Sequence, residues 1–116
     1  MTWNVQFHPE FAREAGQYSA SVRSEIVASV RLLEHFGPGL GRPTADTLSG
    51  SKHANMKELR FKADGGVWRI AFAFDPMRSA ILLVGGDKSG VASGRFYKGL
   101  IKRADDRFDQ HLEALK

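Results

Sequence analysis

The chain has 116 residues, a formal net charge of +4, a pI near 9.7 and no cysteine. This length is enough to bury a core without disulfides or metals, so we expect one domain over residues 1–116. The missing cysteines exclude disulfides, thiolate metal sites and a cysteine nucleophile. No apolar run approaches the ~20 residues of a transmembrane helix, and residues 1–11 contain no apolar signal core, which together indicate a cytoplasmic protein. The basic balance favours a polyanionic partner, although surplus Lys and Arg often serve only solubility.

The first half of the chain predicts a strand followed by a helical hairpin. Residues 2–8 alternate apolar and polar side chains, which is typical of a half-buried strand. Pro9 favours the start of a helix, and the helical stretch runs to about Phe36 with a break or bend near Gly16. The Gly- and Pro-rich stretch 37–43 ends the helix, and a polar loop is expected to about residue 53.

The second half predicts three strands and a helix. The strands are expected at 56–62, 67–75 and 80–86, with turns at 64–66 and 75–79. Apolar residues at helical spacing predict an amphipathic helix over about 93–115. The fold class is therefore predicted to be α+β: an N-terminal strand and helical hairpin, a three-stranded antiparallel meander and a C-terminal helix.

The alternation within the strands also predicts their register and their two faces. A turn at Gly65-Gly66 would pair Phe61 with Ile70, and a four-residue loop would pair Phe74 with Ile81. The second hairpin would also bring Gly86 beside Arg69. One face is then an apolar core under the helical hairpin. The other is expected to be shallow and floored by alanines, and to carry Arg60, Lys62, Arg69 and, at its rim, Lys88.

These basic residues suit one kind of chemistry better than others. The four histidines stand far apart without ligand spacing, which disfavours a metal site, and no phosphate-binding glycine motif is present. RNA supplies its own nucleophile, the 2′-hydroxyl, so its cleavage needs alignment, charge stabilisation and proton transfer. Arginine offers forked donors to phosphate, and a lysine crowded by cations can move protons. A solvated basic surface is the alternative. Arg69 fits that alternative poorly, because an unpaired cation in the middle of a sheet costs stability.

Four segments in this order resemble the RelE/ParE toxin superfamily, and most closely its HigB-like, phage-related branch. The segments are MKELRF (56–61), VWRIAFAFD (67–75), AILLVGGDKSG (80–90) and ADDRFDQHL (104–112). The resemblance covers nearly the whole chain and implies a RelE-like fold. It also implies the toxin of a type II toxin–antitoxin pair, a metal-independent and cofactor-free endoribonuclease that cleaves mRNA on the ribosome. The implied partners are this mRNA and a helix-turn-helix antitoxin, with no membrane or metal.

The motifs carry roles to particular residues. Arg60 matches the arginine of the ELR strand and Arg69 the aromatic-flanked arginine, so the resemblance implies that both hold the scissile phosphate. Lys88 matches the loop lysine and would assist proton transfer, although its neighbours are Asp87 and Ser89 where many relatives carry consecutive lysines. Lys57 is a second candidate for proton transfer, ranked lower because parity places it on the core face. Further RNA contacts are expected from Lys62, Arg95, Tyr97 and Lys98, and Tyr97 is as compatible with ordinary packing.

Two other functions fit the same pattern. ParE-like members of the superfamily inhibit DNA gyrase with the same fold, so the fold cannot decide between them. A non-catalytic RNA-binding domain is the third candidate. The strand-face arginines and the loop lysine favour the nuclease.

Overall fold

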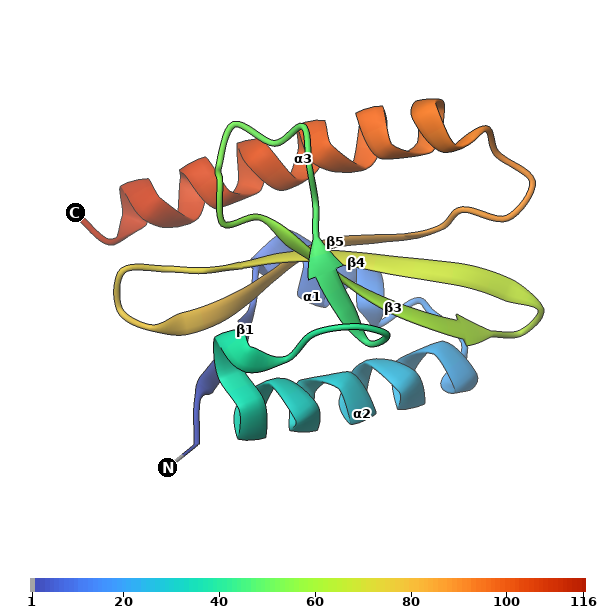
Figure 1. The fold of residues 1–116 in the computed structure, drawn as a ribbon, viewed down its shortest axis with the longest axis horizontal. Helices are drawn as coiled ribbons and strands as arrows, with labels where there is room; N and C mark the ends of the chain where they lie inside the picture. Colours follow the sequence, from blue (N-terminus) through green and yellow to red (C-terminus); the bar gives the residue numbers. More distant parts are fainter. Residues whose placement is uncertain (1) are drawn as a thin grey trace.

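The computed structural model describes residues 2–116 and has an α+β fold (Figure 1). The predicted order of strand, helical hairpin, meander and C-terminal helix is confirmed. The elements are β1 (Asn4–Phe7), α1 (Pro9–Ala15), α2 (Ala20–Phe36), the short 3-10 helix η1 (Gly37–Gly39), β2 (Ala45–Thr47), β3 (Lys57–Ala63), β4 (Gly66–Phe74), β5 (Ser79–Asp87) and α3 (Ser93–Ala114). Strand β2 was not predicted and lies in the stretch expected to be a loop. No helix within residues 2–116 is long and apolar enough to cross a bilayer.

Local side-chain contacts set where the helices begin and end. The Nδ1 atom of His8 accepts a hydrogen bond from the backbone of Glu10 (3.1 Å), and Ser19 Oγ accepts one from the backbone of Val22 (3.2 Å). These caps start α1 and α2 as separate helices, so the break or bend predicted near Gly16 is a complete break. Gly37 ends α2 with φ of +57°, and an added Cβ would lie 2.3 Å from the Trp3 ring, so the position requires glycine.

The five strands form one sheet in the order β1-β5-β4-β3-β2. β1 runs parallel to β5, and the other neighbours are antiparallel. The two edge strands are four and three residues long, which limits the exposed edge available for pairing with another chain.

The register of the first hairpin differs from the prediction by two residues. Phe61 pairs with Trp68 rather than with Ile70, because the turn is Asp64-Gly65 and not Gly65-Gly66. Both turn residues have positive φ (+52° and +73°), as the tightest hairpin turns require. A shift of two residues keeps every side chain on its predicted face, so the predicted faces of β3 and β4 are correct although their register is not.

The second hairpin contains a β-bulge that the sequence did not predict. Phe74 pairs with Ala80 and not with Ile81, so the predicted pairing is wrong by one residue at the turn. An irregularity between Ala71 and Phe72 then shifts the register, and the predicted pairing of Arg69 with Gly86 is confirmed. Leu83 is the extra residue.

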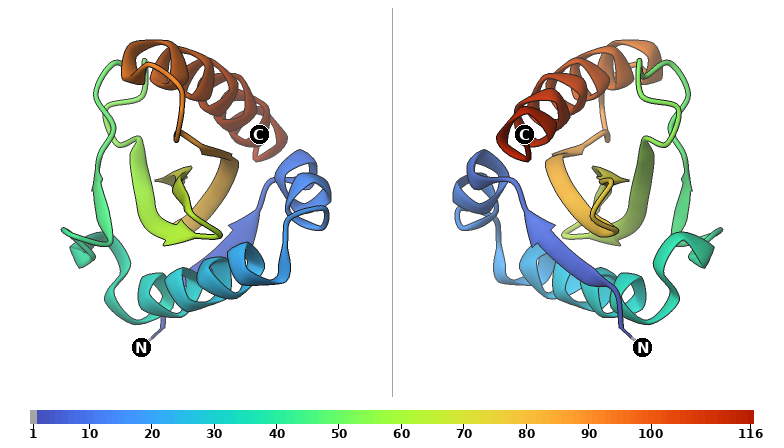
Figure 2. Two further views of the ribbon diagram at one scale, coloured as in Figure 1. Left: turned by 90° about the vertical axis from the view of Figure 1, so that its right-hand side faces the viewer. Right: turned by 90° about the vertical axis from the view of Figure 1, so that its left-hand side faces the viewer.

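Helices cover both faces of the sheet, which corrects the predicted open face (Figures 1 and 2). Phe11, Ile26 and Leu33 of α1 and α2 pack on one face. On the other, α3 packs on the alanine floor, and the buried residues there include Ala71, Ala73, Leu83, Leu100, Ala104 and Phe108. An amphipathic helix needs an apolar surface, and this face of the sheet provides it. Arg60 and Arg69 also lie on this face, and Arg69 contacts Tyr97 in the first turns of α3.

Candidate functional site

Arg60 and Arg69 stand directly opposite each other on β3 and β4. Like charges at such positions repel, and the sheet compensates with a carboxylate. Glu58, two residues before Arg60 on the same face, places Oε1 3.6 Å from Arg69 Nε and Oε2 4.0 Å from Arg60 Nε. Arg69 and Glu58 are each only 6% exposed. Two guanidinium groups therefore converge on one buried carboxylate.

Tyr97 of α3 completes this cluster. Its hydroxyl donates to Glu58 Oε1 (2.8 Å) and accepts from Arg69 Nε (3.2 Å). Burial, followed by the hydrogen bond to Glu58, raises the pKa of Tyr97, so the phenol stays neutral around pH 7. Arg69 Nη1 donates to the carbonyl of Trp68 (2.9 Å), which fixes the guanidinium further. We refer to Glu58, Arg60, Arg69 and Tyr97 as the arginine cluster.

Lys88 joins the cluster from the loop after β5. Its Nζ lies 5.8 Å from the centroid of the Tyr97 ring. The neighbouring Asp87 carboxylate holds this loop, accepting from the backbone of Val67 (3.0 Å) and of Ser89 (2.9 Å). The Ser89 side chain and backbone lower the pKa of Asp87, so it remains ionised. The Asp and Ser that flank Lys88 therefore order the lysine loop.

Two acidic residues of the site were not predicted as functional. Asp46 Oδ2 lies 4.0 Å from Arg60 Nη1 and 2.9 Å from Arg42 Nε. Nothing in the sequence marks Asp46, because it belongs to the unpredicted strand β2. The position of Glu58 could be predicted in part, since strand alternation places it on the same face as Arg60.

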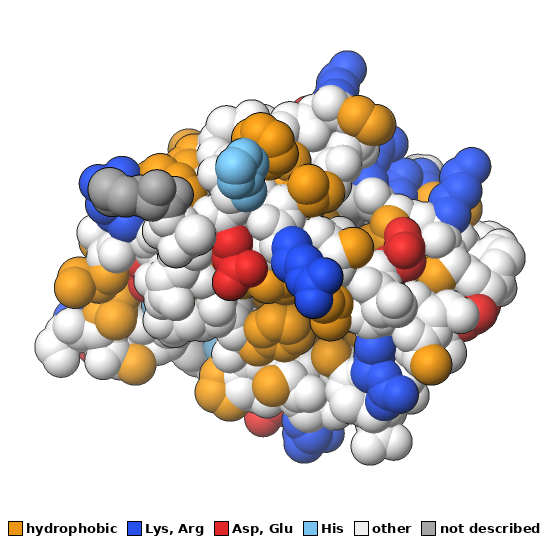
Figure 3. Space-filling model, turned by 90° about the horizontal axis from the view of Figure 1, so that it is seen from below, with side chains coloured by type: hydrophobic (Ala, Val, Ile, Leu, Met, Phe, Trp, Pro, Cys, Tyr) orange, Lys and Arg blue, Asp and Glu red, His pale blue; other side chains and the backbone are white. Residues whose placement is uncertain are grey.

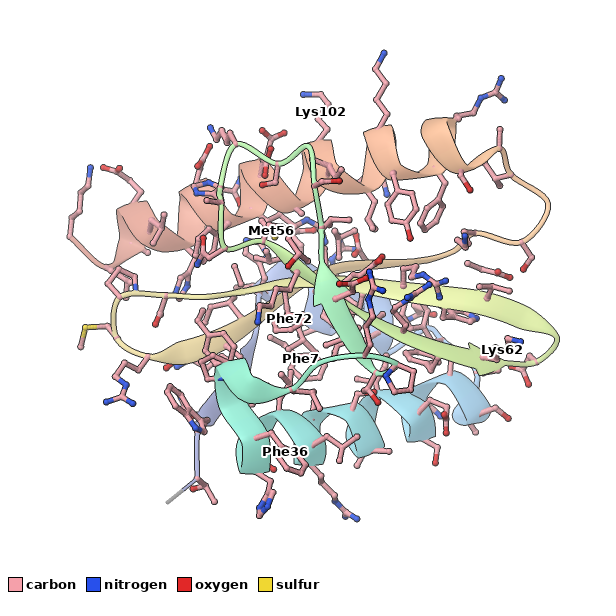
Figure 4. All side chains as sticks on the ribbon, in the orientation of Figure 1. Phe7, Phe36, Met56, Lys62, Phe72 and Lys102 are labelled. Atoms are coloured by element: carbon pink, nitrogen blue, oxygen red, sulfur yellow. The ribbon has the colours of Figure 1, made fainter. Side chains whose placement is uncertain are left out.

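Two surface hollows flank the arginine cluster. One, of about 330 Å³, is lined by Pro43, Arg60, Phe61, Lys62, Val67 and Arg69. The other, of about 550 Å³, lies between the 48–55 loop and α3 and is lined by Gly50, Lys52, Gly94, Tyr97, Lys98, Ile101, Lys102, Asp105 and Asp106. In Figure 4, Lys62 marks the sheet end of this region and Lys102 the helix above it. The hydrogen bond between Arg69 and Tyr97 joins a residue of each hollow.

The remaining predicted residues separate into two groups. Lys62, Arg95 and Lys98 are exposed, and none of them forms an ion pair within residues 2–116. Lys57 is not brought to the cluster: its Nζ donates to the Pro38 carbonyl (3.1 Å), on the α2 side of the sheet, as its parity predicted. Across residues 2–116, no three His, Asp or Glu side chains gather in a way that would hold a metal ion.

Comparison with known proteins gives the family. Residues 14–109 match the family described as "Phage derived protein Gp49-like (DUF891)". The Mycobacterium tuberculosis protein named as toxin HigB3 is 42% identical over 104 residues, covering 90% of this chain and 89% of that protein. The one named as toxin HigB2 is 48% identical over 88 residues, and the match covers 75% of this chain but only 43% of that longer protein.

A solved structure has a similar fold. A mutant of the E. coli toxin RelE in its free state superposes with a TM-score of 0.62 at 12% sequence identity, covering 89% of this chain and 98% of RelE. The chain therefore belongs to the Gp49-like family and is related to the HigB proteins, and its fold is like that of RelE.

Proposed function

We propose that this toxin is an endoribonuclease that cleaves mRNA on the ribosome in the cytoplasm, with arginine and lysine side chains in place of a metal ion. The observation that carries the proposal is the convergence of Arg60 and Arg69 on the carboxylate of Glu58. Guanidinium groups that already surround one anion are suited to a second, the scissile phosphate. The two flanking hollows leave room for RNA on either side of them.

In this proposal the two arginines and Lys88 have different tasks in the cleavage. The 2′-oxygen of the RNA attacks the phosphorus, the bond from phosphorus to the 5′-oxygen breaks, and a 2′,3′-cyclic phosphate results. Arg60 and Arg69 stabilise the charge on the non-bridging oxygens. Hydrogen bonds to Tyr97 and Trp68 use two of the five N–H donors of the Arg69 guanidinium, which leaves donors for phosphate. Lys88, beside Tyr97, donates a proton to the departing 5′-oxygen, and water accepts the proton of the 2′-hydroxyl.

Glu58 acts as a positioning residue in this proposal. It binds Tyr97 directly and lies beside Arg69, so it holds the guanidinium in place before RNA arrives. Lys57 takes no part, because its ammonium group is bound on the opposite side of the sheet.

As a member of a toxin–antitoxin family, the chain has a cognate antitoxin as its partner, and we propose a helix-turn-helix protein. Exposed apolar side chains remain on the α1–α2 side, where Phe7, Val27, Leu32 and Phe36 are 37–51% exposed. Figure 3 views this side and shows hydrophobic side chains between basic ones.

The test is induced expression of the wild type, Arg69→Ala and a control, Arg31→Ala, with mapping of mRNA 5′ ends in the same cells. Arg31 is an exposed cation on α2, outside the cluster. We expect growth arrest and new cleavages at ribosomal A-site codons for the wild type and the control. Both should vanish in Arg69→Ala, since loss of one preorganised donor group costs ~100-fold or more in rate.

Each of the other outcomes has a meaning. Arrest without mRNA cleavage would indicate gyrase inhibition. No arrest from soluble wild-type protein would indicate a non-catalytic RNA-binding domain. Because Arg69 is buried, Arg60→Ala serves as a second variant whose side chain is 36% exposed and whose loss disturbs the core less.

A further inference from the structure

Lys88 stands where β5 ends and the segment that leads to α3 begins (Figure 1). It is the only Lys or Arg between residues 85 and 94, so the proposed proton donor has no second cation in its own loop. Its N–H donates to the carbonyl of Val67 (2.8 Å), which extends the pairing of β4 and β5 by one residue. Side chains alternate along a strand, so Lys88 shares the face of Gly86, the residue that pairs with Arg69. The place of Lys88 beside the arginine cluster therefore depends on this last pairing.

The Asp87 carboxylate completes the pairing in place of a backbone carbonyl. In a regular antiparallel pair, the N–H of Val67 would donate to the carbonyl of Lys88. Here that N–H donates to Asp87 Oδ1 (3.0 Å) and to Ser89 Oγ (3.2 Å). The Lys88 carbonyl accepts instead from the N–H of Val91 (3.3 Å). Because a side chain takes over this bond of the sheet, the backbone can turn directly after Lys88.

A second hydrogen bond and a glycine fix the position of this carboxylate. Asp87 Oδ1 also accepts from the backbone of Ser89 (2.9 Å) and binds the Ser89 hydroxyl. A Cβ added to the buried Gly66 would lie 2.6 Å from Asp87 Oδ2, so the carboxylate occupies the space that a side chain would need. The contacts of Asp87 therefore act on the backbone around Lys88.

We propose that Asp87 is a positioning residue for the cleavage, which holds Lys88 where its ammonium group can protonate the departing 5′-oxygen. This inference rests on the proposed ribonuclease function and deepens it. If the backbone of Lys88 shifts, the ammonium group moves from its place 5.8 Å from the centroid of the Tyr97 ring. Misplacement of a catalytic group by about 1 Å can slow a reaction about 100-fold. In this proposal Asp87 itself neither contacts the RNA nor transfers a proton.

The experiment measures cleavage of a short mRNA on purified ribosomes at increasing concentrations of toxin in excess. Lys88→Ala should lower the rate at saturation about 100-fold or more, the contribution of a general acid. Asp87→Ala should lower the same rate about tenfold and leave the half-saturating concentration unchanged. Asp87→Asn keeps an acceptor for both N–H groups and should recover most of the rate. Asp64→Gly removes a carboxylate that also binds a serine, in the turn of the other hairpin, and should match the wild type.

Two further measurements test whether Asp87 acts through Lys88. In a Lys88→Ala background, Asp87→Ala should cause no additional loss, because the group that it positions is already absent. A substrate with sulfur in place of the departing 5′-oxygen should be cleaved equally fast by the wild type and by both single variants, since a thiolate leaves without a proton. Losses that multiply in the double variant, or that persist with the sulfur substrate, would overturn the proposal.

Gly66→Ala keeps the test valid if Asp87→Ala does not fold. The added methyl group displaces the carboxylate of an unchanged Asp87, so the same loss and the same recovery with sulfur are expected. Gly99→Ala adds a methyl group in open space on α3 and is the matched control. Thermal melting establishes that each variant is folded.

The two proposals fail in different ways. If the wild type cleaves, and Asp87→Ala and Gly66→Ala cleave at the same rate, the role of Asp87 is wrong and the ribonuclease proposal stands. If the wild type does not cleave mRNA on ribosomes, both proposals are wrong.

Discussion

At the scale of single residues, the site depends on a buried cation that the fold must neutralise. Arg69 is 6% exposed and lies opposite another arginine, which would be costly without Glu58 and the hydroxyl of Tyr97. The same contacts that stabilise Arg69 hold its guanidinium in a single orientation. A group fixed before the substrate binds needs no reorganisation during the reaction, so stability and catalysis depend here on the same hydrogen bonds.

The hydroxyl of Tyr97 allows this coupling to be measured. Tyr97→Phe keeps the ring and removes the two hydrogen bonds, so we expect the free energy of unfolding to fall by about 1–3 kcal/mol and cleavage to slow about tenfold. Tyr18→Phe is the matched control, since Tyr18 packs by its ring in the other core. Urea unfolding and ribosomal cleavage assays report the two effects. Equal behaviour of the two variants would show that the hydroxyl of Tyr97 does not position Arg69.

Strand alternation predicted part of this cluster and could not predict the rest. It placed Arg60, Arg69 and Glu58 on one face and Lys57 on the other, because side chains alternate strictly along a strand. The contact of Tyr97 with Arg69 depends on how α3 docks, which no local pattern encodes. The roles in RNA binding and catalysis remain predictions.

At the scale of elements, His8 links the start of α1 to the end of α3. Its Nδ1 caps α1 by accepting from Glu10, which leaves Nε2 to donate to Gln110 Oε1 (3.0 Å). The neutral ring is therefore held in one tautomer, and protonation would remove the acceptor that α1 needs. Pro9 predicted this helix start, but histidine is an unusual cap, so the second contact was not foreseen.

The cap makes stability depend on pH. Burial is the main cause that lowers the pKa of His8, so the folded protein favours the neutral ring. A lowered folded pKa contributes stability above the unfolded value of about 6.5 and loses it as pH falls through the folded pKa. We expect melting temperatures to drop more between pH 7.5 and 5 for the wild type than for His8→Asn, because Asn also caps helices and does not titrate. Parallel pH profiles for the two proteins would contradict this.

The register errors also belong to the scale of elements. Hydrophobic alternation cannot distinguish two registers that differ by two residues, because both keep the same side chains on each face. The residues of the turn decide between these registers. Asp64 adopts positive φ in place of Gly66, which moved the first hairpin by two residues. The bulge at Leu83 follows from the packing of two consecutive apolar residues, Leu83 and Val84, under α3, and alternation alone cannot show it.

At the scale of the whole molecule, the sheet has two cores and the site lies where the second one ends. The sequence predicted one covered face, and the alanines of the other suggested a shallow open surface. Alanines instead allow α3 to approach closely, so that Phe108 and Leu100 fill the space above them. The signal was present in the amphipathic stripe of α3, which required an apolar partner, and the alanine face was the surface still uncovered.

Arg107 connects the helices that cover the two faces of the sheet. Its guanidinium binds Glu14 of α1 through two hydrogen bonds (2.8 and 2.7 Å) and donates to the carbonyl of the bulged Leu83 (2.8 Å). The arginine therefore fastens α3 to α1 and satisfies a carbonyl at the irregularity in β5. The hydrogen bonds from Arg107 lower the pKa of Glu14, so the pair stabilises the fold above pH ~4.5 and less as pH falls below it.

A double-mutant cycle measures this connection. Arg107→Gln and Glu14→Gln should each lower the free energy of unfolding by about 1–3 kcal/mol, because each leaves a partly buried charge without its partner. The double variant should lose less than the sum of the two, with a coupling of about 1 kcal/mol or more. Urea unfolding at pH 7 gives all four values. Strict additivity would mean that Arg107 acts through Leu83 alone, in which case the bulge, and not the ion pair, holds α3 over the sheet.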